Sequence, residues 1–314
     1  MLPTAILFPG QGSQEMNMGR DVAEAQSSAM DMWVLAEKLS GLSLREIYWG
    51  APDAAPAPEM SDTKALQPAL TVVNLTLWHA VARKAAEAQS VGVAGHSLGE
   101  YAALAAAGVL GVEDVVKAVC VRGKLMAGAG KEGHGMAAVL KLPLETVERI
   151  VDQAAKQSGA FLRIANHNSP AQFVISGEKP ALDAAAALVK EAKGRAVPLA
   201  VSGAFHSPLI SEAANEFAKV LDGLDWRTPA FPVLMNVCGQ PMSDPGVLKS
   251  FSTAQMTSSV LWTTTMQSFY DSGARRFVEV GPKGVLTKLV GQNLPGKDDA
   301  IALSVGSMEA ALAL

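Results

Sequence analysis

The feature that most constrains the fold is the pentapeptide GHSLG at residues 95–99, which lies between an apolar run and a helix-forming run. Residues 90–94 predict a buried strand, and residues 100–107 predict a helix. A serine with glycines two positions away on either side, at a strand-to-helix turn, matches the nucleophile elbow. Glycine lets neighbouring elements approach closely, so the turn can be tight. The pattern therefore predicts an α/β fold with Ser97 as a candidate nucleophile.

The alternative is a glycine-rich helix cap in which Ser97 is only the N-cap residue. The functional interpretation adds an oxyanion site, because the amide of Leu98 would lie at a helix N-terminus. It also requires a base, and the chain has five histidines. Spacing leaves His167 and His206 nearly equivalent, with His206 preferred because it follows the return to the larger unit. No acidic residue stands out as a third member, so a serine–histidine pair is as consistent as a triad.

The middle of the chain has a different order of predicted strands and helices from its two ends. Strand-like and helix-like runs follow one another there in the order βαββαβ, which is the ferredoxin-like pattern. The strands are expected at residues 136–140, 161–165, 172–176 and 195–199, and the helices at 144–157 and 179–192. Outside this region we expect strands at 5–9, 232–237 and 276–280, helices at 22–39 and 66–83, and a loop at 50–58. The smaller unit is therefore expected as an insertion in the larger one.

Composition excludes several other classes of protein. Hydrophobic residues make up 49% and charged residues 18% of the 314 positions, which excludes general disorder. With 26 basic and 30 acidic residues the net charge is −4, so no nucleic-acid partner is expected. The two cysteines lack metal-ligand spacing. The N-terminus lacks signal-peptide features, and the long uncharged stretch 250–270 is rich in Ser, Thr and Gln. We expect no membrane association and a cytoplasmic location.

Four motifs in order carry a family resemblance: FPGQGSQ at residues 8–14, GHSLGE at 95–100, VRG at 121–123 and GAFHS at 203–207. Together they closely resemble the malonyl-CoA:acyl-carrier-protein transacylases, the acyltransferases of fatty-acid and polyketide synthesis. The resemblance runs from about residue 4 to about residue 290. It implies an α/β fold with an α/β-hydrolase-like large subdomain, residues 1–130 and 201–314. A ferredoxin-like small subdomain, residues 131–200, would be inserted in it.

The resemblance also implies roles for six residues. These are Ser97 as the acylated nucleophile, His206 as its base, Gln11 and Leu98 as the oxyanion-hole amides, Arg122 as the clamp for the substrate carboxylate, and Gln255 as the residue whose main-chain carbonyl orients the histidine. A guanidinium suits the carboxylate role, because its planar fork pairs with both oxygens and stays charged when enclosed. Near Gln255 the sequence departs from the family's common form, with Ser259 in place of proline and Leu261 in place of arginine.

The implied activity is transfer of a malonyl group from malonyl-CoA to the phosphopantetheine thiol of holo acyl carrier protein. The reaction would be ping-pong through a malonyl-serine and would supply fatty-acid biosynthesis. No bound cofactor or metal is implied, malonyl-CoA is a substrate, and a monomer is expected. Phe205 before the histidine resembles the malonyl-selecting form.

Alternatives within the class are service to a polyketide synthase or to a malonate decarboxylase system. A serine esterase or thioesterase needs the same elbow, but it has no use for the Arg122 clamp or the Gln11 motif. A carrier-protein docking module with a degenerate site is disfavoured, because Ser97, His206, Gln11 and Arg122 are all present.

Overall fold

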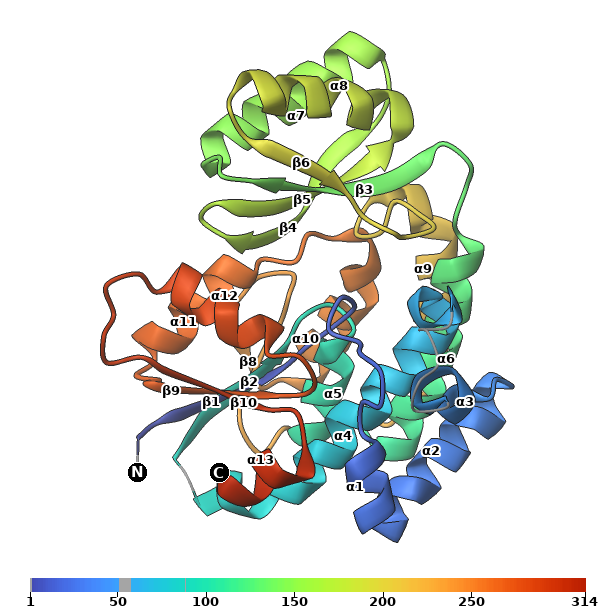
Figure 1. Cartoon of the computed structure of the whole chain (residues 1–314), viewed down its shortest axis with the longest axis vertical. Coiled ribbons are helices and arrows are strands. Elements are labelled where there is room, and N and C mark those ends of the chain that lie inside the picture. The colour runs from blue at the N-terminus through green and yellow to red at the C-terminus, as the bar shows by residue number, and fades with distance from the viewer. Residues whose placement is uncertain (1, 51–57, 88) are drawn as a thin grey trace.

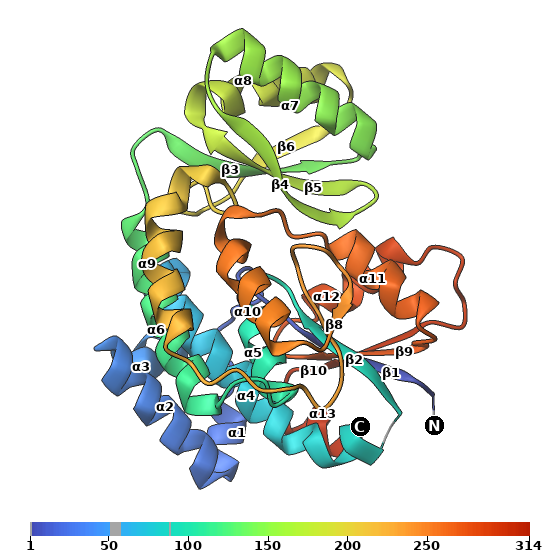
Figure 2. The same ribbon diagram turned by 180° about the vertical axis from the view of Figure 1, so that it is seen from behind.

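The structure is a computed structural model that describes residues 2–50, 58–87 and 89–314, and it contains two sheets that lie one above the other (Figures 1 and 2). The larger sheet has the order β10-β9-β1-β2-β7-β8 and is parallel except for β8, which pairs antiparallel with β7. Its strands are β1 (Thr4–Phe8), β2 (Ser90–Gly95), β7 (Val233–Leu234), β8 (Pro241–Met242), β9 (Arg276–Val280) and β10 (Ile301–Val305).

Side chains of the central strand β1 alternate between the two faces of this sheet, as a strand with both faces buried requires. Ile6 and Phe8 pack into the core beneath one face, and Ala5 and Leu7 pack into a separate core on the other. The second core is closed by α11 (Trp262–Asp271) and α12 (Val285–Asn293). The first is built from the remaining helices of the large unit: α1 (Arg20–Ala25), α2 (Ser27–Ser40), α3 (Leu44–Trp49), α4 (Thr63–Glu87), α5 (Gly99–Ala106), α6 (Val112–Gly128), α9 (Ser211–Asp222), α10 (Pro245–Ala254) and α13 (Met308–Ala313).

The smaller sheet is antiparallel and has the order β4-β5-β3-β6. One face packs on its two helices, α7 and α8, through residues such as Val139 and Ile175. The other face, with Met136 and Val174, is turned toward the large unit and lines a cavity there. Its elements are β3 (His134–Leu140), α7 (Leu144–Ser158), β4 (Leu162–Ser169), β5 (Gln172–Glu178), α8 (Lys179–Glu191) and β6 (Arg195–Pro198).

The structure corrects parts of the expected element map. The helix expected over 22–39 is two helices, because Gln26 is extended; its amide ends α1 on Val22 while its carbonyl accepts the first bonds of α2. The strand expected at 232–237 pairs over only two residues, Val233 and Leu234. Strand β10 was not expected at all. The loop expected at 50–58 lies, apart from its ends, outside the described residues.

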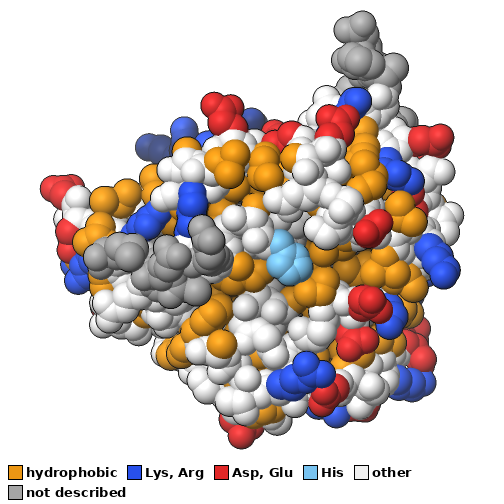
Figure 3. Space-filling model, turned by 90° about the horizontal axis from the view of Figure 1, so that it is seen from below, with side chains coloured by type: hydrophobic (Ala, Val, Ile, Leu, Met, Phe, Trp, Pro, Cys, Tyr) orange, Lys and Arg blue, Asp and Glu red, His pale blue; other side chains and the backbone are white. Residues whose placement is uncertain are grey.

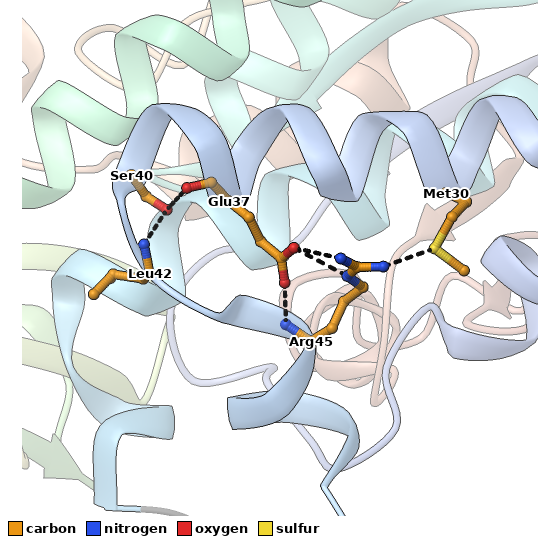
Figure 4. A network of polar contacts seen from close by, with 5 residues as sticks. All are labelled: Met30, Glu37, Ser40, Leu42 and Arg45. Carbon is orange, nitrogen blue, oxygen red and sulfur yellow. Dashed lines mark hydrogen bonds and ion pairs between the residues drawn. The ribbon is translucent and has the colours of Figure 1, made fainter.

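An ion pair fixes the short helix α3 against α2 (Figure 4). Arg45 donates to the Glu37 carboxylate from its backbone amide at 2.9 Å and from Nη2 at 2.7 Å, and its Nη1 lies 3.4 Å from Met30 Sδ. The backbone and the side chain of Arg45 thus both donate to the same carboxylate, which links α3 to α2.

The face opposite the small sheet mixes acidic, basic and hydrophobic side chains without a dominant sign of charge (Figure 3). Among the described residues no helix has the length and apolarity needed to cross a bilayer, and no three side chains of His, Cys, Asp or Glu cluster as metal ligands would.

Candidate active site

Ser97 lies on a tight turn between β2 and α5, at the carboxyl end of the larger sheet. Its φ of +49° is in the left-handed region, which a non-glycine residue rarely adopts. The neighbouring glycines leave no room for a side chain: a Cβ on Gly95 would lie 1.9 Å from the carbonyl carbon of Gly99, and one on Gly99 would lie 2.1 Å from the Phe8 oxygen. The glycines thus permit the close approach, and the turn carries Ser97 into the cavity.

His206 is the histidine that the structure brings to Ser97. Its Nε2 lies 2.8 Å from Ser97 Oγ, and the residue is 4% exposed. The other nitrogen, Nδ1, lies 3.1 Å from the carbonyl oxygens of both Gln255 and Ser258. Carbonyls only accept, so Nδ1 carries the proton and Nε2 is free to accept from the serine hydroxyl. Two main-chain carbonyls therefore occupy the place of a triad carboxylate; the Gln255 carbonyl was expected there and that of Ser258 was not.

Burial also sets the charge of this histidine. Desolvation, followed by the nearby charge of Arg122, lowers the pKa of His206 to about 3, although the two carbonyl bonds oppose the change. His206 is therefore neutral at physiological pH, which is the form that a general base requires.

Arg122 reaches the same cavity from α6 and is 1% exposed. Its Nη1 donates to Gln67 Oε1 at 3.0 Å, and its Nη2 donates to Gln255 Oε1 at 2.9 Å and lies 3.4 Å from Ser97 Oγ. In the described part of the chain all of these partners are neutral. Arg122 is therefore neither a solvated arginine nor one paired directly with an acid, and its guanidinium lies beside the hydroxyl of Ser97.

The buried carboxyl group of Glu100 accepts hydrogen bonds from two residues that also bond to Ser97. Its Oε2 accepts from the amide of Asn236 at 2.6 Å and its Oε1 from Gln255 Nε2 at 2.9 Å. Asn236 in turn accepts from the Ser97 amide at 2.7 Å through Oδ1, and Gln255 Nε2 also donates to the Ser97 carbonyl at 2.8 Å. The backbone amide and carbonyl of Ser97 are therefore bonded by Asn236 and Gln255, and both of these residues also donate to Glu100.

Sequence analysis assigned no role in the site to Glu100, to the Gln255 side chain or to Asn236. The only available signal was that a charged residue opens an otherwise apolar helix, and such a residue is ordinarily a solvated helix start. Burial raises the pKa of Glu100 to about 8, while the Asn236 amide and the charge of Arg122 oppose that change.

Gln11 and Leu98 both line the cavity, which has a volume of about 240 Å³. Across the ranges that the structure describes, neither amide donates to a protein acceptor. The two loops lie side by side because β1 and β2 are paired, with Phe8 opposite Gly95. Two unpaired amides next to Ser97 can serve as an oxyanion site.

The remaining histidines lie apart from the nucleophile's hydroxyl. His96 lines the cavity, where its Nε2 lies 2.8 Å from Asn168 Oδ1. His79 is exposed on α4, His134 begins β3, and the ring of His167 packs edge-on against Phe173.

The fold and the site together define a class: α/β proteins in which a serine at the end of a parallel strand is bonded to a histidine, beside two free amides. The family model described as "Acyl transferase domain" matches residues 6–312. The chain belongs to this acyl transferase family.

Comparison with individual proteins shows which members of the family this chain is similar to. The chain is 36% identical over 302 residues to the malonyl CoA-acyl carrier protein transacylase of Haemophilus influenzae, with 96% of this chain and 95% of the relative covered. Among solved structures, an acyl carrier protein S-malonyltransferase from Vibrio cholerae superposes with a TM-score of 0.89 at 34% identity, covering 99% of each chain. A malonyl-transacylase solved in complex with a type II polyketide-synthase acyl-carrier protein gives 0.88 at 33% identity, covering 99% and 98%.

Proposed function

We propose that this protein transfers the malonyl group from malonyl-CoA to the phosphopantetheine thiol of holo acyl carrier protein, as an [acyl-carrier-protein] S-malonyltransferase. The observation that carries the proposal is the Ser97–His206 bond of 2.8 Å in a cavity that also holds the buried guanidinium of Arg122, 3.4 Å from the same hydroxyl. A cation aimed at an acyl-serine suits an acyl group with a free carboxylate. The names of the relatives point to the same substrate.

In the proposed first half-reaction His206 Nε2 takes the Ser97 proton while Oγ attacks the thioester carbonyl of malonyl-CoA. The negative charge on the tetrahedral oxygen is stabilised by the amides of Gln11 and Leu98. As the carbon–sulfur bond breaks, the imidazolium returns its proton to the CoA sulfur, leaving malonyl-Ser97 and free CoA. In the second half-reaction the carrier thiol gives its proton to His206 and attacks the ester, and Ser97 Oγ regains the proton when it leaves.

Two further residues have supporting roles in this proposal. Arg122 pairs with the malonyl carboxylate in the ground and transition states alike. The Gln255 carbonyl, together with that of Ser258, holds the proton on Nδ1 of His206 so that Nε2 is the base.

The pathway served is proposed to be fatty-acid biosynthesis in the cytoplasm, by a monomer that takes malonyl-CoA as substrate and needs no bound cofactor. A polyketide synthase is the second candidate pathway, because one similar malonyl-transacylase was solved in complex with a type II polyketide-synthase acyl-carrier protein. Purified holo carrier proteins of the two pathways, compared as acceptors by their kcat/KM, distinguish these alternatives.

The domain division belongs to the same proposal. Residues 1–130 and 201–314 form an α/β-hydrolase-like subdomain, and residues 131–200 form a ferredoxin-like subdomain inserted in it. The strand orders and the separate cores of the two sheets support the division. The cavity lies where the two parts meet, because its walls come from both.

The competing activity is hydrolysis by a serine esterase or thioesterase, and CoA release distinguishes it from transfer. With malonyl-CoA alone, a transferase releases CoA only once per Ser97 and then stops. Added holo carrier protein restores turnover and yields malonyl-carrier. Sustained CoA release without any acceptor thiol, accompanied by free malonate, would overturn the transferase proposal.

A further inference from the structure

The two carbonyls that hold His206 lie on a segment that is shared between the two sheets. Residues 255–260 begin as a short 3₁₀ turn in the large unit, and their far end pairs with the edge strand β4 of the small sheet. The Val260 amide donates to Ala165 O at 2.8 Å, and the His167 amide donates to Val260 O at 2.9 Å. The segment that orients the histidine is therefore anchored to the small sheet by main-chain bonds.

Arg163 adds a side-chain anchor on both sides of the Ser258 carbonyl. From β4, its Nη1 donates to Thr257 O and its Nη2 to Ser259 Oγ, each at 2.9 Å. Ser259 Oγ in turn donates to Ile164 O at 2.7 Å. One guanidinium thus holds the residue before Ser258 and the residue after it, and charged donors of this kind form the stronger hydrogen bonds. The contact requires a hydroxyl at position 259, which the proline expected from the family's common form would not supply.

We propose that Arg163 and Ser259 are positioning residues for the proton-transfer step of the proposed acyl transfer. Their contacts, which we call the Arg163 clasp, fix the Ser258 carbonyl against Nδ1 of His206 and so aim Nε2 at the Ser97 hydroxyl. Neither residue is among those that line the cavity or bond to Ser97. The clasp therefore acts through His206, and it links the placement of the small sheet to the alignment of the base.

A matched pair of arginine substitutions tests this proposal. Arg163→Met keeps the apolar stem and removes the clasp, whereas Arg149→Met makes the same change at an exposed residue of α7 whose Nη2 donates to Thr146 Oγ1 at 3.3 Å. The first measurement is steady-state transfer of the malonyl group from malonyl-CoA to holo acyl carrier protein, at varied concentrations of malonyl-CoA. We expect the kcat of Arg163→Met to fall roughly 10- to 100-fold with KM within about twofold, because a misaligned base impairs the chemical step more than binding. Arg149→Met should match wild type.

Ser259→Ala provides a milder variant that removes one arm of the clasp. We expect a smaller fall in kcat, and the double variant should be no slower than Arg163→Met alone, because both substitutions break one network. If Arg163→Met fails to fold, which far-UV circular dichroism would show, Ser259→Ala carries the test. Wild-type kcat in Ser259→Ala would then overturn the proposal, as would wild-type kcat in a folded Arg163→Met.

A second readout is independent of turnover and separates this proposal from the proposed function. The Nδ1 proton of His206 is held by two carbonyls, so it should exchange slowly and give a resolved resonance in ¹H–¹⁵N spectra of the ring. Faster exchange in Arg163→Met, and not in Arg149→Met, supports the clasp. An unchanged resonance contradicts it. The two proposals can also fail separately. If the resonance is lost in Arg163→Met but the wild-type protein never forms malonyl-serine, the clasp is supported and the proposed function is wrong.

Discussion

Two buried ionisable residues, Arg122 and Glu100, are bonded to opposite ends of one amide side chain, that of Gln255. Gln255 accepts from Arg122 through Oε1 and donates to Glu100 through Nε2. Both ionisable residues are at most 1% exposed. Burial raises the pKa of Glu100 to about 8, so its carboxyl group is mostly protonated at pH 7 and adds little negative charge beside Arg122. The enclosed guanidinium, whose direct partners Gln67 and Gln255 are neutral, therefore keeps its capacity to bind an incoming carboxylate.

Removal of Arg122 should therefore change substrate choice more than folding. For Arg122→Ala we expect kcat/KM for malonyl-CoA to fall about 100-fold, close to 2.7 kcal/mol, because a charged hydrogen-bond partner of the carboxylate is lost. Acylation by acetyl-CoA should fall much less, so the malonyl-to-acetyl ratio narrows. Competition between the two thioesters, followed by intact mass, measures that ratio. An equal loss for both donors would assign Arg122 a purely structural role.

Glu100 should prove important for both stability and rate. Glu100→Gln replaces one of two acceptors by an amide donor, which cannot accept from both Asn236 and Gln255. We expect the free energy of unfolding in urea to fall by about 1–3 kcal/mol, with slower Ser97 acylation. Glu113→Gln, at a side chain that is 74% exposed, is the control and should change neither quantity. A Glu100→Gln protein with wild-type stability and rate would remove Glu100 from the account.

The pH dependence of acylation follows from the burial of His206. Its pKa is lowered to about 3, first by desolvation, so the neutral base persists well below the ordinary value of 6.5. The rate constant for Ser97 malonylation should therefore stay level as the pH falls from 7 to 5. The pKa of about 8 for Glu100 lies above this window. Rapid-quench measurements across the range provide the test, and an inflection near pH 6.5 would contradict the assignment.

At the scale of elements, the turn from β2 to α5 works only because its glycines lack Cβ atoms. Gly99→Ala would place a carbon 2.1 Å from Phe8 O, on the strand next to β2, and backbone cannot yield there cheaply. We expect a destabilisation of about 3 kcal/mol or more and loss of acylation. In Gly128→Ala, at the end of α6, the new carbon meets nothing within 4 Å, so stability should hold or rise by up to about 1 kcal/mol. Urea unfolding of both variants measures the difference.

The same turn shows how far sequence alone could predict the site. The glycine spacing and the flanking periodicity were enough to place Ser97, because those constraints are local. Choosing His206 over His167 was not possible from spacing; it required the family resemblance, since the partner arrives from 109 positions away along the chain. Sequence analysis did not predict the contacts of the Ser258 carbonyl, the Gln255 side chain and Glu100 for a similar reason. Bonds formed only by tertiary packing leave no periodic signal in the sequence.

The predicted boundaries of helices and strands were wrong where the backbone conformation does not follow the pattern of apolar residues. The run through residues 22–39 is apolar at helical spacing, yet Gln26 takes an extended conformation that the pattern does not encode. Strand β10 has exposed and half-buried residues over most of its length, so it lacks the apolar run that revealed β9.

At the scale of the whole molecule, the cavity depends on both sheets. The large sheet supplies Ser97 from the end of β2, and the small sheet supplies the opposite wall with Met136, Val174 and the amide of Asn168. The histidine follows the small unit in the chain and is held by a segment that bonds to β4. Ser97 and His206, the proposed nucleophile and base, are thus carried by different parts of the chain, and their alignment depends on how the two sheets pack.

The central claim is that Ser97 accepts a malonyl group, and intact-mass spectrometry tests it most directly. Wild-type protein mixed with malonyl-CoA, without carrier protein, should gain one malonyl group that is absent from Ser97→Ala and removed when holo acyl carrier protein is added. The same adduct on Ser97→Ala, or no adduct and no CoA release from wild type, would contradict the account.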